Sequence, residues 1–202
     1  MSIDVIRLFA VPMFSQRIDG FGERRAELLR EIDALREGSP GIVASNCGAW
    51  HSPRDLHLRN NAAFAWACGA VLAMAREALR ESYGNFQAVE LRLVDAWALV
   101  APPGSWVAPH HHFPAAWSGV LWIAAEHAAV GPDAAHKAGR LELMSPVPVP
   151  ESFGQAAAAS VTPKDGVVVL FPSILEHFVH PTRSSEPRVS LSFNLEIASA
   201  RT

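Results

Sequence analysis

The sequence has few cysteines, a single tyrosine and no strong excess of charge of either sign. Its 17 basic and 20 acidic residues give a net charge of −3 at pH 7. Two cysteines, Cys47 and Cys68, are too few for a disulfide framework or a paired-cysteine zinc site. A balanced charge also argues against a nucleic-acid partner. The composition therefore predicts a protein of the reducing cytoplasm that binds no nucleic acid.

Long apolar runs and internal repeats are also missing. No run of about 18 apolar residues is present, and the alanine-rich stretch 62–75 is followed by charges, so we interpret it as a buried helix. The first 20 residues carry an acid, Asp4, ahead of their first basic residue and are broken by Pro12, which makes a poor signal peptide. A chain of 202 residues fits one domain. We expect a single domain over 1–202 and no membrane partner.

Helical periodicity comes first along the chain and strand-like alternation follows. Helices are predicted over 22–37, which is closed by Gly38, and over 61–83. Short strands are predicted at 89–99, 117–124, 140–144, 159–162, 167–171 and 188–197. In the first of these, simple alternation puts Leu91, Leu93, Trp97 and Leu99 on one face. Two helices followed by many strands predict an α+β fold, a jelly roll braced by helices that contribute no ligand.

The last predicted strand alternates most regularly. Its apolar side chains, from Val189 to Ile197, are expected to pack on the helices, and its polar side chains point to the opposite face. Arg188 begins that polar face, and Ser190 follows two residues later. An arginine and a serine on one face can form a carboxylate clamp. The alternative is a surface arginine paired with Glu186.

Three consecutive histidines, at positions 110–112, lie between prolines and tryptophans. Because side chains alternate along a strand, His110 and His112 share a face and His111 points away. A usable metal site needs a third ligand, and His177 and His180 are the candidates further along the chain. The alternative is a polar surface loop whose histidines only satisfy hydrogen bonds.

The order of these motifs resembles the 2-oxoglutarate- and iron(II)-dependent oxygenase superfamily. It is most similar to a largely uncharacterised bacterial and phage branch with the pattern H-x-H, SGV, FPSxLxH and RxSxSFN. The matching positions are His110, His112, 118–120, 171–177 and 188–194. The resemblance spans most of the chain.

The resemblance implies a cupin-like double-stranded β-helix that hydroxylates an unknown substrate. Iron(II) would be held by His110, His112 and His177, and no catalytic residue beyond these ligands is expected. His112 stands where the superfamily usually has a carboxylate, so the usual facial triad becomes one of three histidines. The resemblance also implies that 2-oxoglutarate binds Arg188 and Ser190, with Asn194 nearby.

The substrate side of the site is less strongly marked. Trp106 and Trp122 are candidate substrate contacts, and the loop 45–59 is expected to reach the pocket mouth. The substrate would be a small molecule or a peptide, and a homodimer is compatible with the sequence. Two alternatives stay open: a three-histidine cupin-like dioxygenase that does not use 2-oxoglutarate, with Arg188 on a substrate carboxylate, and a non-enzymatic metal- or ligand-binding jelly roll.

Overall fold

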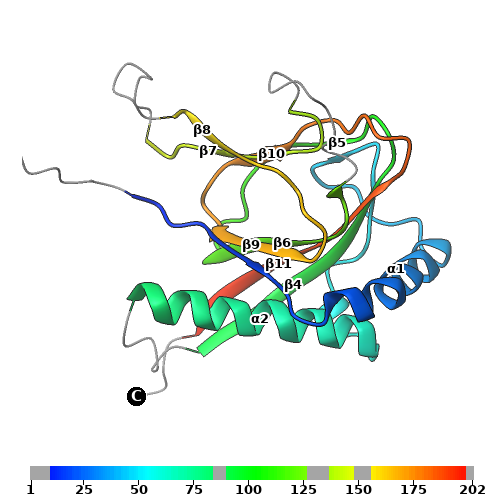
Figure 1. Ribbon diagram of the computed structural model, residues 1–202, viewed down its shortest axis with the longest axis horizontal. Coiled ribbons are helices and arrows are strands. Elements are labelled where there is room, and N and C mark those ends of the chain that lie inside the picture. Colours follow the sequence, from blue (N-terminus) through cyan, green and yellow to red (C-terminus); the bar gives the residue numbers. More distant parts are fainter. Residues whose placement is uncertain (1–9, 84–89, 127–136, 148–155, 199–202) are drawn as a thin grey trace, which may run out of the picture.

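The computed structural model describes residues 10–83, 90–126, 137–147 and 156–198, and these form two sheets and two long helices. Figure 1 shows their arrangement. The helices are α1 (Phe21–Glu37) and α2 (Ala62–Tyr83), with a short 3-10 turn η1 (Leu56–Leu58). The strands are β1 (Phe14–Arg17), β2 (Asn46–Cys47), β3 (Trp50–His51), β4 (Glu90–Ala101), β5 (Trp106–His110), β6 (Trp117–Ala124), β7 (Leu141–Met144), β8 (Ala158–Val161), β9 (Val167–Pro172), β10 (His177–Val179) and β11 (Arg188–Ala198).

The strands form a major and a minor antiparallel sheet. The major sheet has the order β1-β9-β6-β11-β4-β3 and the minor sheet has the order β2-β5-β10-β7-β8. The two sheets lie one above the other with the connecting loops between them (Figure 1). From β4 to β11 consecutive strands alternate between the sheets, apart from β7 and β8, which pair in the minor sheet, and this is the pattern of a jelly roll. The predicted α+β fold, a double-stranded β-helix braced by two helices, is confirmed.

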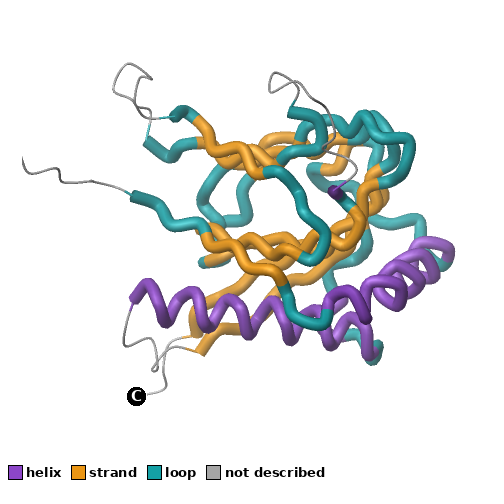
Figure 2. The backbone as a smooth tube through the Cα atoms, in the orientation of Figure 1, coloured by secondary structure: helices purple, strands orange, loops and turns teal. Residues whose placement is uncertain are grey.

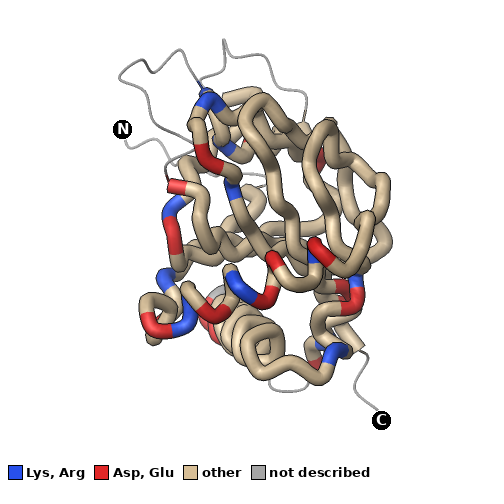
Figure 3. The backbone as a smooth tube through the Cα atoms, turned by 90° about the vertical axis from the view of Figure 1, so that its right-hand side faces the viewer, with Lys and Arg blue, Asp and Glu red and all other residues tan. Residues whose placement is uncertain are grey.

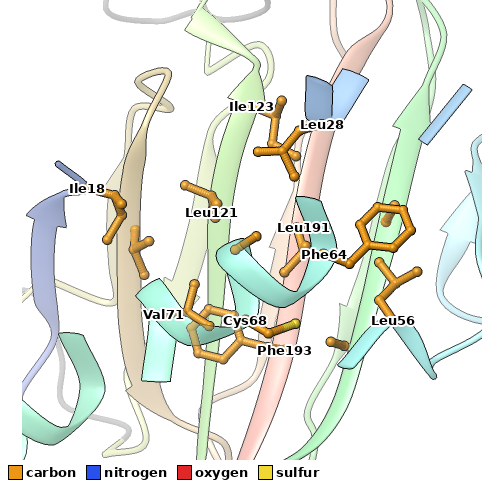
Figure 4. Close-up of a cluster of buried hydrophobic side chains, with 14 of the residues drawn as sticks. Ile18, Leu28, Leu56, Phe64, Cys68, Val71, Leu121, Ile123, Leu191 and Phe193 are labelled. Carbon is orange, nitrogen blue, oxygen red and sulfur yellow. The ribbon is translucent and has the colours of Figure 1, made fainter. Parts of the chain in front are cut away.

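Both helices cover the outer face of the major sheet (Figure 2). Asn61 begins α2, because its side-chain oxygen accepts the backbone N–H groups of Ala63 and Phe64 at 3.0 and 3.1 Å. The apolar stripe of α2 packs on the side chains of β11 that point outward, including the fully buried Phe193 (Figure 4). The alternation of the last strand predicted this contact correctly.

The α2 segment Ala62–Glu81 meets the length and composition of a membrane-spanning helix, with a mean hydropathy of 1.3 over 20 residues. The sequence alone predicted a buried helix here, because no run of about 18 apolar residues is present. In the fold, Val71 and Leu79 of this helix are fully buried in the core formed with the major sheet. Burial of one face in this way is also how a core helix behaves.

Strand β4 corrects the simple alternation that was predicted for it. Asn194 pairs with Asp95 and the next residue, Leu195, pairs with Leu93, so one residue of β4 is extra and forms a bulge. The bulge reverses which face each later side chain takes. Leu91 therefore packs with the helices, whereas Trp97 lines the space between the sheets. The prediction that they share a face was wrong.

A second, smaller apolar cluster lies between the two sheets. The major sheet supplies Trp122 and Phe171, and the minor sheet supplies Leu141 and Leu143. The inside of the jelly roll is therefore apolar on the side of this cluster, and polar groups can lie beside it.

Charged residues of both signs are interspersed along the chain, with no large region of one sign in the view that Figure 3 shows.

Gly119 on β6 lies where neighbouring groups of the major sheet approach its backbone closely. A Cβ added there would overlap the backbone oxygen of Val169 and the ring of Phe193. We expect Gly119→Ala to lower the free energy of unfolding by about 1–3 kcal/mol, the usual cost of overpacking a core. Urea denaturation followed by circular dichroism measures this change.

Gly69 on α2 is the matched control, because a Cβ added there meets nothing within 4 Å. Gly69→Ala should raise the free energy of unfolding by roughly 0.5–1 kcal/mol through helix propensity. Equal effects of the two substitutions would contradict the packing described for β6.

Candidate metal and cosubstrate site

Two histidines of the predicted triad lie on neighbouring strands of the minor sheet, and the third follows one of these strands. His110 ends β5 and pairs directly with His177, the first residue of β10. A register shift separates this pair from the pair of Val107 and Val179, so β5 carries an extra residue. His112 lies two residues beyond the end of β5, where its backbone N–H donates to the oxygen of Ser173 at 2.9 Å. That bond ties the H-x-H segment to the FPS turn.

The imidazole rings of the triad face one another. The ring centres of His110 and His177 lie 4.3 Å apart, and those of His110 and His112 lie 4.8 Å apart. One nitrogen from each ring lies within 4.8 Å of the other two, which makes a group able to hold a metal ion. His111 is exposed and Nε2 of His180 lies 3.5 Å from Oε1 of Glu142, and neither histidine belongs to this group.

Backbone carbonyl groups orient two of the three rings. Nδ1 of His110 lies 2.7 Å from the oxygen of Ala108, and Nδ1 of His177 lies 2.9 Å from the oxygen of Leu175. A carbonyl oxygen can only accept a hydrogen bond, so Nδ1 must carry the proton in each ring. The Nε2 lone pairs are left free, as metal-binding histidines require.

Burial keeps the three imidazoles neutral. It is the main cause that lowers the pKa of His112 to about 3 and that of His177 to about 4, with the charge of His110 adding to both. Burial also lowers the pKa of His110. A neutral imidazole binds a metal and a protonated one does not, so the site is ready for metal at neutral pH.

Arg188 lies in the same cavity as the triad. Its side chain is only 3% exposed, and its Nη1 donates to the oxygen of Gly139 at 3.4 Å. Its Nε has no hydrogen-bond partner within the described part of the chain, and no carboxylate there forms an ion pair with it. Burial lowers the pKa of Arg188 to about 10, so the guanidinium is still charged at neutral pH. A buried cation without an anion is a binding group.

The other predicted cosubstrate residues lie along β11 on the same face. Ser190 is 4% exposed and pairs with Leu99 and Trp122, but it does not line the cavity, whereas Ser192 does. The side chain of Asn194 accepts a hydrogen bond from Ser118 at 2.8 Å and donates one to Asp95 at 2.9 Å. Both ends of the amide are thus hydrogen-bonded within the protein, and Asn194 lines the outer groove rather than the cavity that Arg188 lines.

The two candidate tryptophans are placed differently. Trp122 is buried and lines the cavity with the triad. Trp106 is 39% exposed and is not among the residues that line the cavity. It neighbours Val107, which points inward, so the alternation of β5 turns Trp106 to the outside. The structure thus brings only Trp122 to the site.

The loop before η1 closes one side of the cavity, as the sequence analysis expected. Ser45, Asn46, His51 and Arg54 all line it. The ring of His51 stacks on that of Trp97 with 5.5 Å between their centres, and Trp97 in turn lies 5.4 Å from the ring of His112. The sequence did not predict that His51, Arg54 and Trp97 line this cavity together. The bulge of β4 turns Trp97 inward, and the conformation of the loop places His51 and Arg54.

The donor set suits iron(II) and a dicarboxylate. Imidazole nitrogen is a ligand that iron(II) accepts readily. Three neutral imidazoles on one side leave the opposite side of an ion free for other ligands. The unpartnered Nε of Arg188, in the same cavity, offers a charged hydrogen bond to a carboxylate. Both cofactors fit the residues that are present.

Comparisons with known proteins agree with this chemistry. Residues 95–194 match the family described as "Putative 2OG-Fe(II) oxygenase". The match includes all three histidines and Arg188. No curated protein sequence matches the chain.

Solved structures show the same fold. A prolyl-4-hydroxylase from Pseudomonas putida is 19% identical, with a TM-score of 0.62 and 92% of each chain covered. A prolyl hydroxylase from Trichoplax adhaerens, in complex with a hypoxia inducible factor peptide, is 12% identical and has a TM-score of 0.64. The match covers 91% of this chain and 83% of that chain. HygX from Streptomyces hygroscopicus, with nickel, 2-oxoglutarate and hygromycin B bound, is 12% identical and has a TM-score of 0.61. The match covers 92% of this chain and 83% of that chain.

The family match spans β4 to β11 and so covers the strands that carry the histidines and the buried arginine. The family description names 2-oxoglutarate and iron(II), the same two cofactors that the donor set suits. The chain belongs to the 2-oxoglutarate- and iron(II)-dependent oxygenase superfamily and is an oxygenase that uses both cofactors.

Proposed function

We propose that the protein oxidises an unactivated C–H bond of a small molecule or peptide, with iron(II) held by His110, His112 and His177. The observation that carries the proposal is the cavity shared by three neutral imidazoles and one buried arginine, which forms no ion pair with any residue that the structure describes. We also propose that the chain acts as one domain in the cytoplasm.

Arg188 is the proposed clamp for the distal carboxylate of 2-oxoglutarate, and Ser190, which lies two residues further along the same face of β11 but outside the cavity lining, is the proposed second hydrogen-bond donor. The deep burial of Arg188 supports this over the alternative of a surface pair, because Glu186 is exposed and forms no ion pair with it. Gly139 accepts one guanidinium N–H and fixes the orientation of the group. Asn194 supports the clamp from further along β11 by holding Ser118 and Asp95 in place.

Iron(II) and 2-oxoglutarate, once bound, supply the oxidising chemistry. The protein residues orient the two cofactors and keep water out. Trp122, Phe171 and Leu141 form the apolar wall of the cavity and exclude water from the reacting groups. No acid or base beyond the ligands is needed for this role.

The proposal is tested by anaerobic titration of the metal-free protein with iron(II) and then 2-oxoglutarate. Chelation of iron by the cosubstrate should produce a weak visible charge-transfer band. The three-histidine dioxygenase that does not use 2-oxoglutarate predicts bound iron without this band. A non-enzymatic jelly roll with a closed zinc site predicts neither the band nor any consumption of 2-oxoglutarate.

Substitution of each ligand tests the triad. We expect His110→Ala, His112→Ala and His177→Ala each to lose the metal during dialysis, because removal of one of three ligands leaves a weak site. Metal analysis of the dialysed proteins measures the loss. His111→Ala and His180→Ala are matched controls that should keep the full metal content. Full metal content in His112→Ala would show that another residue is the third ligand.

Substitution of Arg188 tests the clamp. Arg188→Met should keep the metal and weaken 2-oxoglutarate binding by about 2–5 kcal/mol, the usual cost of removing one partner of a buried charge pair. Titration of the charge-transfer band in the variant measures this loss.

Arg183→Met is the control for that measurement, because Arg183 is an exposed arginine of the segment before β11. It should bind 2-oxoglutarate as the unmodified protein does. The clamp would be refuted if Arg188→Met and Arg183→Met gave the same affinity.

A further inference from the structure

Two cavities meet beside the triad. The inner cavity contains the three histidines and Arg188, and a larger outer groove of about 410 Å³ runs past Phe113 and Glu196. Four residues line both: Ser45, Arg54, His110 and His112. The groove has the size of a small-molecule site and is lined by exposed residues, including His111 and Phe113. A substrate that enters through it must pass Arg54 and Ser45 to reach the proposed metal.

Backbone hydrogen bonds hold Arg54 at this junction. The oxygen of Arg54 accepts the N–H of Ala96 at 3.1 Å, and Ser52 exchanges bonds with Ala98 at 3.0 and 2.9 Å. The segment 52–54 is therefore hydrogen-bonded to β4 next to the bulge. The guanidinium carbon lies 5.4 Å from the ring centre of Trp97, a distance at which a cation is attracted to the ring face. Arg54 is thus placed by the fold.

Arg54 has no anionic partner among the residues that the structure describes. Its guanidinium forms no ion pair or side-chain hydrogen bond there. Two acids near it bind other groups: Asp55 forms an ion pair with Arg59 at 2.9 Å, and Asp95, in the wall of the outer groove, accepts a hydrogen bond from Asn194. Glu196, in the groove wall, is exposed to solvent. The Ser45 hydroxyl, beside Arg54, also has no hydrogen-bond partner in the described ranges.

The charge balance of the proposed site leaves Arg54 uncompensated. Three neutral imidazoles bring no negative charge to a divalent metal. A 2-oxoglutarate dianion offsets part of the summed charge of the metal and Arg188, and Arg54 adds one more positive charge. Guanidinium groups bind carboxylates and phosphates through paired hydrogen bonds. A second anion therefore has both a binding group and an electrostatic reason to enter.

We infer that Arg54 and Ser45 bind an oxyanion of the substrate, a carboxylate or a phosphate, at the junction of the two cavities. The inference rests on the proposed function and narrows its substrate class. Arg54 lies close to the triad, because the ring of Trp97 lies 5.4 Å from its guanidinium carbon and 5.4 Å from the ring of His112, and Arg54 lines both cavities with His110 and His112. The oxidised carbon then lies a few bonds from the anionic group.

Matched probe pairs test this inference in the anaerobic protein loaded with iron(II) and 2-oxoglutarate. The carboxylate arm compares N-acetyl-L-amino acids with their C-terminal carboxamides, and the phosphate arm compares glycerol 3-phosphate with glycerol. A free-amine arm uses the corresponding amino acid amides. Perturbation of the charge-transfer band measures binding beside the metal without turnover.

We expect at least one anionic probe to bind roughly tenfold or more tightly than its neutral partner, the effect of one charge-assisted hydrogen-bond pair. Arg54→Gln should remove that preference while leaving 2-oxoglutarate affinity unchanged, and Arg54→Lys should restore part of it. Arg59→Gln, in which an arginine already paired with Asp55 is changed, should keep the full preference. The stronger arm identifies the anion as carboxylate or phosphate.

Three results would overturn the inference while the proposed function stands. These are an unmodified protein that binds no anionic probe more tightly than its neutral partner, a preference that survives in Arg54→Gln, and tighter binding of the free amines. Loss of 2-oxoglutarate affinity in Arg54→Gln would also overturn it, by assigning the guanidinium to the cosubstrate. A protein without the charge-transfer band would refute the proposed function and the inference together.

Discussion

The antiparallel pairing of β5 with β10 is the constraint on which the site depends. It sets His110 directly opposite His177, and the extra residue in β5 lets both Val107 and His110 point into the jelly roll. The carbonyl oxygens that orient the two rings belong to Ala108 and Leu175, each two residues before its histidine. Register, ring orientation and tautomer are therefore all fixed by backbone that is local to the pair.

The two faces of the major sheet have different roles: the outer face packs in the main core, and the inner face lines the site. Its outer face packs against both helices with small and apolar side chains, and Gly119 allows Phe193 to approach the backbone of β9. Its inner face carries the polar residues of β11 and the tryptophans at 97 and 122. The cost of burying Arg188 is offset only when an anion pairs with it.

The sequence predicted periodic features well and irregular ones poorly. Both helices, the long strands and the polar face of β11 follow from repeating patterns. The grouping of His110 and His112 with His177 was predicted from the alternation of side chains along a strand together with the family resemblance. The bulge in β4 has no signal in an apolar run, so Trp97 was assigned to the wrong face. Trp106 was placed near substrate from its position in the chain, whereas strand alternation turns it outward. Arg54 was missed because a loop has no period from which its direction can be read.

The substitution of a histidine for a carboxylate has an electrostatic consequence for the whole cavity. A dication held by three neutral imidazoles keeps its full charge, whereas a carboxylate ligand would cancel part of it. The attraction for anions is therefore stronger here than at a site with an acidic ligand, and burial strengthens it further by removing water. Among the residues that the structure describes, no aspartate or glutamate lines the inner cavity with the triad. The compensation must come from what binds, which makes anionic ligands part of the stability of the loaded site.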